Sequence, residues 1–239
     1  MAEPTPTPEQ PEPSFRDALS AAARKSSLGK VPPGETPTAG ALLAAMGGVR
    51  GLVESILPGL GFLVVFTVTK ELLPSVLAPL AVSVVFILLR LVMRQPVTTA
   101  IAGALGVGIS AGLALITNDA NNNFVPGFFI NGGVVLVMVA SLIARRPFVG
   151  LIVSLLLNDD DWRSNPAKVR VATIATILWT ALSALRLAVQ LPLYLAEATE
   201  ALAATKLVMG VPLYAALLWV TWLLVRTAWR TRERPADGV

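Results

Sequence analysis

Six long apolar runs occupy most of the chain and constrain its fold more than any other feature. Each run holds roughly 20 mostly apolar residues, which is the length that an α-helix needs to cross a bilayer. Prolines within the runs are compatible with helices, because neighbouring helices satisfy the backbone groups that proline frees. We predict an all-α membrane protein whose residues 45–230 form a six-transmembrane-helix bundle. The predicted spans are residues 52–69, 75–93, 97–117, 124–144, 171–195 and 207–229.

The composition agrees with this prediction and excludes several classes of protein. Charged residues make up 14% of the chain, against roughly 25% in a soluble domain. The chain has neither cysteine nor histidine, which excludes disulfide scaffolds, thiolate zinc sites and catalysis by an imidazole base or a cysteine nucleophile. The sequence also lacks the common nucleotide-binding and metalloprotease motifs. We expect a protein that is not an enzyme and that uses no cofactor or metal.

The cationic residues predict the orientation of the bundle. With six spans, sixteen of the 19 Lys and Arg residues fall on one face, whereas only Lys70 and Lys206 fall on the other. Cytoplasmic loops are enriched in cations, so both termini are predicted to be cytoplasmic. The excess of Arg over Lys favours a bacterial source, which makes this a multi-pass protein of the bacterial cytoplasmic membrane. The expected partners are the bilayer and its anionic lipids, and we expect no nucleic acid.

The two ends of the chain differ in composition from the bundle. Residues 1–44 contain eight of the 18 prolines, and such a segment buries too little apolar surface to fold. We predict a disordered, Pro-rich cytoplasmic tail there and a short cytoplasmic tail over residues 231–239.

A seventh apolar run, residues 148–157, is too short to span a bilayer. We predict an interfacial helix over residues 147–158 on the cytoplasmic face. A basic turn formed by Arg145, Arg146 and Pro147 precedes it, with Pro147 in the first helical turn. Trp162, which follows three aspartates, is expected at the level of the lipid headgroups.

Three polar residues are predicted to lie deep in the membrane. Arg186 is 15 residues beyond the start of its span, which is about 22 Å at 1.5 Å per residue. Gln190 lies one turn away on the same face, and Asn131 lies at a similar depth on the fourth span. A charge at such a depth costs about 2.5–3.5 kcal/mol, which favours a functional polar cluster. The alternative is that Arg186 extends its side chain outward to the lipid headgroups.

A candidate ion pair joins the first two spans. Glu54 lies near the cytoplasmic start of the first span and Arg90 lies at the cytoplasmic end of the second. The short connection makes these helices antiparallel neighbours, so the two side chains share a depth. Such a pair neutralises both charges at the membrane boundary. It either stabilises the topology or provides a carboxylate linked to proton or cation movement.

The third span carries small residues at every fourth position, Ala104, Gly108 and Gly112. A ridge of this kind lets a second helix approach closely. It predicts helix packing within the bundle, with dimerisation as the alternative.

Three segments resemble a known family. They read GGVRGLVESILPGLGFLVVFTVT from Gly47, ARRPFVG from Ala144 and DDDWR from Asp159. They resemble an actinobacterial multi-pass membrane family, a domain-of-unknown-function family, over residues 45–230. A more distant similarity is to the intracellular septation protein A family, although the Asn-containing pattern of its later span is missing here. The first resemblance implies six spans and no known site residues, and the second implies a role in septation or envelope synthesis.

Two functions are compatible with these observations. The basic cytoplasmic loops and the interfacial helix favour a non-enzymatic scaffold or organiser in a cell-envelope process. The alternative is a small-solute or ion transporter or channel with a polar site near Arg186. The sequence shows no internal repeat, which would be the usual indication of a transporter.

Overall fold

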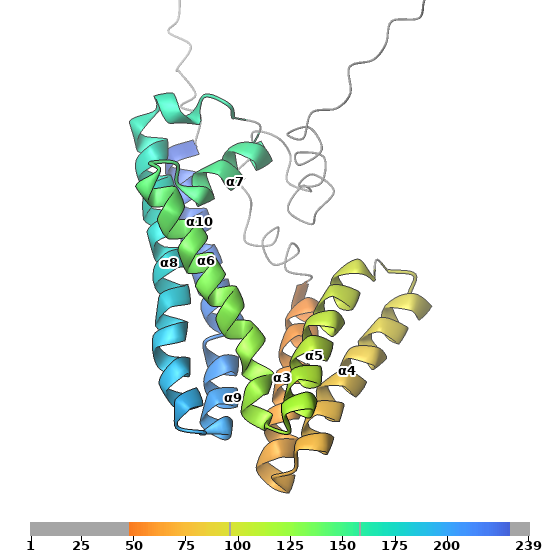
Figure 1. Ribbon diagram of the computed structural model, residues 1–239. Helices are drawn as coiled ribbons and strands as arrows, with labels where there is room; N and C mark the ends of the chain where they lie inside the picture. The colour runs from red at the N-terminus through yellow and green to blue at the C-terminus, as the bar shows by residue number, and fades with distance from the viewer. Residues whose placement is uncertain (1–47, 96, 158, 230–239) are drawn as a thin grey trace, which may run out of the picture.

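The computed structural model describes residues 48–95, 97–157 and 159–229, and within these ranges the chain is helical with no strand (Figure 1). The predicted tails, residues 1–44 and 231–239, lie outside the described residues. The elements are α3 (Gly48–Thr69), α4 (Leu72–Val92), α5 (Thr98–Thr117), the 3-10 helix η2 (Ala120–Phe124), α6 (Val125–Ile143), α7 (Phe148–Leu157), the 3-10 helix η3 (Trp162–Ser164), α8 (Pro166–Leu195), α9 (Thr199–Val208) and α10 (Val211–Trp229).

Five helical segments are long and apolar enough to cross a membrane, which indicates a multi-pass membrane protein. They overlap the second to sixth predicted spans. The segments are Leu72–Val92, Ala100–Thr117, Ala120–Ile143, Pro166–Leu195 and Thr199–Trp229. In α3 the apolar stretch Val53–Thr69 is shorter, so the first predicted span, residues 52–69, and with it the total of six, remains a prediction.

The last of these segments differs from the predicted span 207–229. The helical crossing begins earlier, at Thr199, and is broken at Met209 and Gly210 into α9 and α10. Pro212 explains the break, because proline has no backbone N–H and its ring clashes with the carbonyl one turn before it. Gly210 fits at the break because a Cβ atom there would lie 2.7 Å from the carbonyl oxygen of Lys206.

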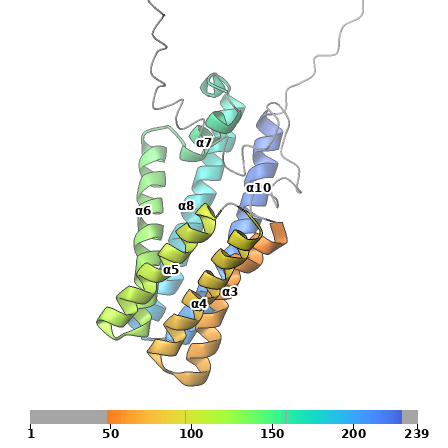
Figure 2. The ribbon, with the colours of Figure 1, turned by 90° about the vertical axis from the view of Figure 1, so that its right-hand side faces the viewer.

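Six of the described α-helices form two groups of three, and α7 and α9 lie at the ends of the bundle. In one group α4 packs between α3 and α5, and in the other α8 packs against both α6 and α10. The two groups diverge toward the end of the bundle that carries α7, which we call the α7 end (Figure 1). In Figure 2 the groups overlap, with α4 and α5 in front of α8. They meet at the opposite end, where η2 packs on α5 and α9 packs on α3. We call this the η2 end.

The buried core lies at the η2 end, where α3, α4 and α5 meet η2 and α9, and partly buried residues of α6 and α8 pack against it. Phe62 of α3 meets Phe124 edge to face, with ring centroids 5.6 Å apart. The rest of this core consists mainly of small residues, which let the helices approach closely. Its buried members are Phe62, Val76, Ala111, Ala114, Ala120, Phe124, Leu202 and Ala203. Large apolar side chains elsewhere are exposed on most helices, as expected for surfaces that face lipid.

The small-residue ridge of α5 does not pack as the sequence predicted. A Cβ atom built at Gly108 or Gly112 would meet no other atom within 4 Å. The face of α5 that packs inside the bundle instead carries Ala111 and Ala114, which are buried. Ala104 is only half-buried. The reason is that α4 and η2, the neighbours of α5, lie against the alanine face.

Helix α7 crosses the end of the second group, as Figure 1 shows, and its first turn is held by two hydroxyl groups. The backbone N–H of Phe148 donates to Ser141 Oγ of α6 at 3.2 Å, and that of Val149 donates to Thr176 Oγ1 of α8 at 3.2 Å. These hydroxyls satisfy amides that a helix N-terminus leaves without partners. Trp162 is 3% exposed. It therefore packs inside the protein, against α7 and α8, and its expected depth at the level of the lipid headgroups stays a prediction.

Candidate functional site

Arg186 lies in α8 and is buried inside the bundle. It is 8% exposed, so its side chain does not extend outward to the lipid headgroups. Its guanidinium carbon lies 5.0 Å from the ring centroid of Tyr214, which is a cation–π contact. No acidic residue in the described ranges forms an ion pair with it, and its Nε atom has no hydrogen-bond partner there. Arg186 therefore carries a buried positive charge without a counterion from the described chain.

Gln190 lies one helical turn beyond Arg186 on α8, and Asn131 of α6 lies at the level of Gln190. Gln190 follows Arg186 on α8 and is 4% exposed, and its Nε2 atom has no partner among the described residues. Asn131 of α6 is also buried and donates from Nδ2 to the carbonyl of Gly127 at 2.7 Å.

The register of α6 and α8 places Asn131 and Gln190 at one level. The rings of Phe128 and Tyr194 meet with centroids 5.3 Å apart. Asn131 follows Phe128 by three residues and Gln190 precedes Tyr194 by four, and the two helices are antiparallel. The structure thus gathers the three predicted residues, although within the described ranges no hydrogen bond joins them.

Lys206 of α9 is the fourth residue of this cluster. From the sequence it was expected in a loop on the non-cytoplasmic face. Its ammonium nitrogen lies 4.8 Å from the ring centroid of Phe124. Lys206 lies in the last turn of α9, and the ring that Arg186 contacts lies in the first turn of α10, directly beyond the break. Only the position of the helix break brings Lys206 into the bundle. The sequence feature that could have predicted this position of Lys206 is the pair Gly210 and Pro212, which interrupts the last apolar run.

The broken helix places a helix N-terminus beside these cations. Tyr214, which contacts Arg186, lies in the first turn of α10, and its backbone N–H donates to the carbonyl of Gly210 at 3.1 Å. The amides of a first helical turn point away from the helix and carry the positive end of its dipole. Arg186, Lys206 and the N-terminus of α10 therefore add their positive potentials, which the negative end of the α9 dipole at the same break offsets in part.

Two acidic residues near the η2 end, Glu200 and Asp119, have other partners. Glu200 of α9 forms an ion pair with Lys70. Asp119 caps η2 by accepting from the backbone N–H of Asn121 at 2.8 Å. The arrangement of Arg186, Gln190, Asn131 and Lys206, which we call the polar site, is consequently positive and rich in donors.

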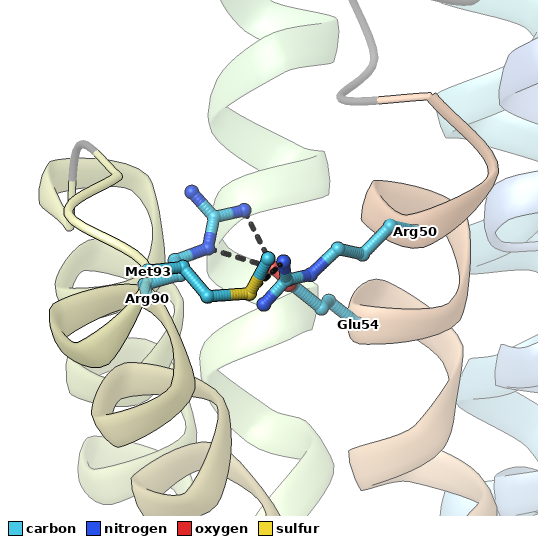
Figure 3. Close-up of polar contacts among 4 residues, drawn as sticks. All are labelled: Arg50, Glu54, Arg90 and Met93. Carbon is cyan, nitrogen blue, oxygen red and sulfur yellow. Dashed lines mark hydrogen bonds and ion pairs between the residues drawn. The ribbon is translucent and has the colours of Figure 1, made fainter.

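A second polar cluster joins α3 to α4 (Figure 3). One carboxylate oxygen of Glu54 accepts from Arg50 Nε at 2.8 Å. The other accepts from Arg90 Nε at 2.9 Å and Nη2 at 2.5 Å. Arg50 also donates to the sulfur of Met93 at 2.9 Å. Because two guanidinium groups hold both oxygens of the carboxylate, the arrangement favours a structural ion pair over a carboxylate that exchanges protons.

Two turns at the α7 end are also structural. Arg145 has a φ of 53°, and its N–H and that of Arg146 donate to α6 carbonyls, so the predicted basic turn ends α6. Asp159 accepts from Lys168 Nζ at 2.6 Å and from Trp229 Nε1 at 2.9 Å, which connects the start of α8 with the end of α10.

The comparisons with known proteins identify a family but no activity. No curated protein and no solved structure matches the chain. A family model described as a protein of unknown function (DUF3159) matches residues 46–232, which include every described helix. This match gives no support to an actinobacterial source or to a similarity with intracellular septation protein A. The chain belongs to the DUF3159 family of proteins of unknown function.

Proposed function

We propose that this protein is a transporter that binds a small solute at the polar site. One observation carries the proposal: Arg186 is 8% exposed within a membrane-crossing helix and has no acidic partner in the described ranges. An ionisable residue inside a membrane is costly and marks a solute or ion pathway by default. A purely structural arginine would be expected to form an ion pair, as Arg90 does with Glu54.

The broken helix supports the same function. Discontinuous helices that end near a buried polar site are characteristic of secondary transporters. Here α9 and α10 are broken beside Arg186, close to the η2 end where the two helix groups meet. Rocking of one group against the other about this junction would expose the polar site to alternate sides.

The membrane and the orientation are part of the proposal. The distribution of cations supports six spans in a bacterial cytoplasmic membrane with both termini in the cytoplasm. The η2 end would then face outward. The proposed activity requires no catalysis, and the bilayer, including its anionic lipids, is the partner.

Cysteine labelling tests whether water reaches the polar site. The chain has no cysteine, so Gln190→Cys can be labelled in membrane vesicles without background. The matched control is Leu185→Cys on the same helix, where the leucine is 52% exposed on an apolar surface. We expect a charged methanethiosulfonate reagent to modify Gln190→Cys and to leave Leu185→Cys unmodified. If both variants fold and neither is modified by the reagent, a solvated binding site is refuted.

The scaffold hypothesis remains a second candidate, supported by exposed cations at the α7 end, including Arg145, Arg146 and Arg163. Complementation of a deletion strain distinguishes the two functions. A transporter requires Arg186 and tolerates the double change Arg145→Gln and Arg146→Gln, whereas a scaffold that acts through its basic surface shows the opposite pattern.

A further inference from the structure

We propose that the polar site binds an oxyanion, a phosphate or carboxylate group held jointly by Arg186 and Lys206 at the N-terminus of α10. The inference rests on the proposed function, because it names the class of solute that the site would take.

The first argument is charge. Arg186 contacts the first turn of α10 and Lys206 lies in the last turn of α9, and within the described ranges neither forms an ion pair. Two like charges in a low-dielectric interior destabilise the fold unless a counterion joins them. The N-terminus of α10 increases the positive potential. A bound anion would therefore interact favourably with three groups at once.

The second argument is the type of atom that lacks a partner. Buried polar atoms are normally hydrogen-bonded, so each exception requires an explanation. In the described ranges the exceptions are Nε of Arg186, Nε2 of Gln190 and, two turns beyond Tyr214 on α10, Nε1 of Trp222. All three are N–H donors. A ligand that satisfies the first two must be an acceptor, which excludes a metal cation or an ammonium group.

The third argument is the geometry of the groups. The planar guanidinium of Arg186 matches two oxygens of a phosphate or carboxylate, and the ammonium of Lys206 acts as a point charge. They come from different helices, α8 and α9, and Arg186 stacks on Tyr214 of α10. An oxyanion between them would bridge the three helices.

Anion binding to the full chain tests this inference. The protein is reconstituted in nanodiscs of neutral phosphatidylcholine and titrated with inorganic phosphate or acetate, with sodium chloride as the ionic-strength control. We expect either oxyanion to raise the midpoint of thermal unfolding. The apparent Kd should increase about tenfold or more in Arg186→Gln and in Lys206→Gln, because each change removes a charge-assisted hydrogen bond. Arg170→Gln, an exposed arginine on the same helix, is the matched control and should bind as the wild type does.

A stability measurement separates this role from a purely structural one. Without oxyanion, Arg186→Gln should be at least as stable as the wild type, because it removes a buried unpaired charge. With oxyanion present the wild type should become the more stable of the two. The inference is overturned if phosphate and acetate act no differently from chloride, if both variants bind like the wild type, or if Arg186→Gln is the less stable protein without oxyanion.

A lipid headgroup and a free solute would present the same chemistry. Repeating the titration in nanodiscs with phosphatidylglycerol distinguishes them. Added phosphate that still binds there supports a free solute, whereas stabilisation by phosphatidylglycerol with no further effect of phosphate supports a site for a lipid phosphate.

Uptake into proteoliposomes separates this inference from the proposed function. Oxyanion binding without uptake would refute transport and leave the binding site. Uptake of a neutral or cationic solute that phosphate and acetate do not inhibit would support transport and refute the oxyanion.

Discussion

At the scale of residues, the bundle contains buried and half-buried charges of two kinds. Glu54 is enclosed by Arg50 and Arg90, so its cluster is held together by complementary charge. Arg186 and Lys206 have aromatic rings beneath them and no acid in the described ranges. The free-energy cost of removing charge from water is thus offset by ion pairs at Glu54. At the polar site no acidic residue of the described ranges offsets it. This contrast is why we assign stability to the first cluster and binding to the second.

The Glu54 cluster predicts a rescue between two substitutions. Glu54→Leu should lower the free energy of unfolding by about 3 kcal/mol, because breaking a buried pair leaves two guanidinium groups to repel each other. Adding Arg90→Leu should restore about 1–2 kcal/mol of this loss. Unfolding in mixed micelles measures both values. A double variant no more stable than Glu54→Leu would contradict the pairing.

Gly150 provides a second prediction at this scale. A Cβ atom at this position would lie 2.6 Å from the ring of Trp162 and 2.7 Å from Ala172. Gly150→Ala should therefore destabilise the protein by about 1–3 kcal/mol, since overpacking forces α7 away from α8. Gly108→Ala on α5 is the matched control, because it meets open space. Thermal unfolding of the two variants should separate them, and equal midpoints would contradict this packing.

At the scale of elements, the break between α9 and α10 is the feature that creates the polar site. It places a helix N-terminus within a single membrane crossing and turns Lys206 toward Phe124. Helix caps show how the other elements end. Arg94, Asn118, Arg145 and Glu197 all have positive φ angles beside the ends of helices, a conformation that terminates a helix. The turns are thus defined by backbone geometry even where no glycine is present.

The break itself can be tested through Gly210. Gly210→Ala places a methyl group against the carbonyl of Lys206, so the break must rearrange. We expect anion binding at the polar site to weaken about tenfold, with far-ultraviolet circular dichroism unchanged because both helices remain. Gly103→Ala, at an open position on α5, should bind normally. Normal binding by Gly210→Ala would show that the exact shape of the break is unimportant.

At the scale of the whole molecule, two groups of three helices are joined through a polar seam at the η2 end. Thr199 of α9 donates to Oδ1 of Asn121 at 2.6 Å, and both residues are buried. Tyr194 of α8 donates to Oδ1 of Asn122 at 2.6 Å. These bonds connect η2, which packs on α5, with the helices that carry the polar site. The seam therefore controls how the two groups are held together.

The seam predicts a difference between two threonines of α9. Thr199→Val leaves Asn121 buried with an unmatched acceptor and should cost about 1–3 kcal/mol. Thr205→Val should cost much less, because the Thr205 hydroxyl bonds only to the Ala201 carbonyl of its own helix. Chemical unfolding of both variants measures the difference. Equal costs would mean that the seam does not hold the groups together.

The sequence by itself determined most of the segments that become helices, with α9 as the exception, and the polar positions that a single helix or a short connection brings together. Lipid offers no hydrogen bonds, so an apolar run must satisfy its backbone internally, which makes each crossing a local property. For the same reason Arg186 and Gln190 share a face through helical periodicity, and Glu54 meets Arg90 because a short turn joins their helices.

Only the tertiary structure decided how the helices pack. It left the glycine ridge of α5 open and buried Trp162 against Gly150. It also capped α7 with hydroxyls from α6 and α8 and placed Lys206 over the ring of Phe124. These contacts join residues distant in the chain. They depend on which helix faces fit together. The pattern of apolar residues cannot predict these faces, because the lipid and the protein interior are equally apolar.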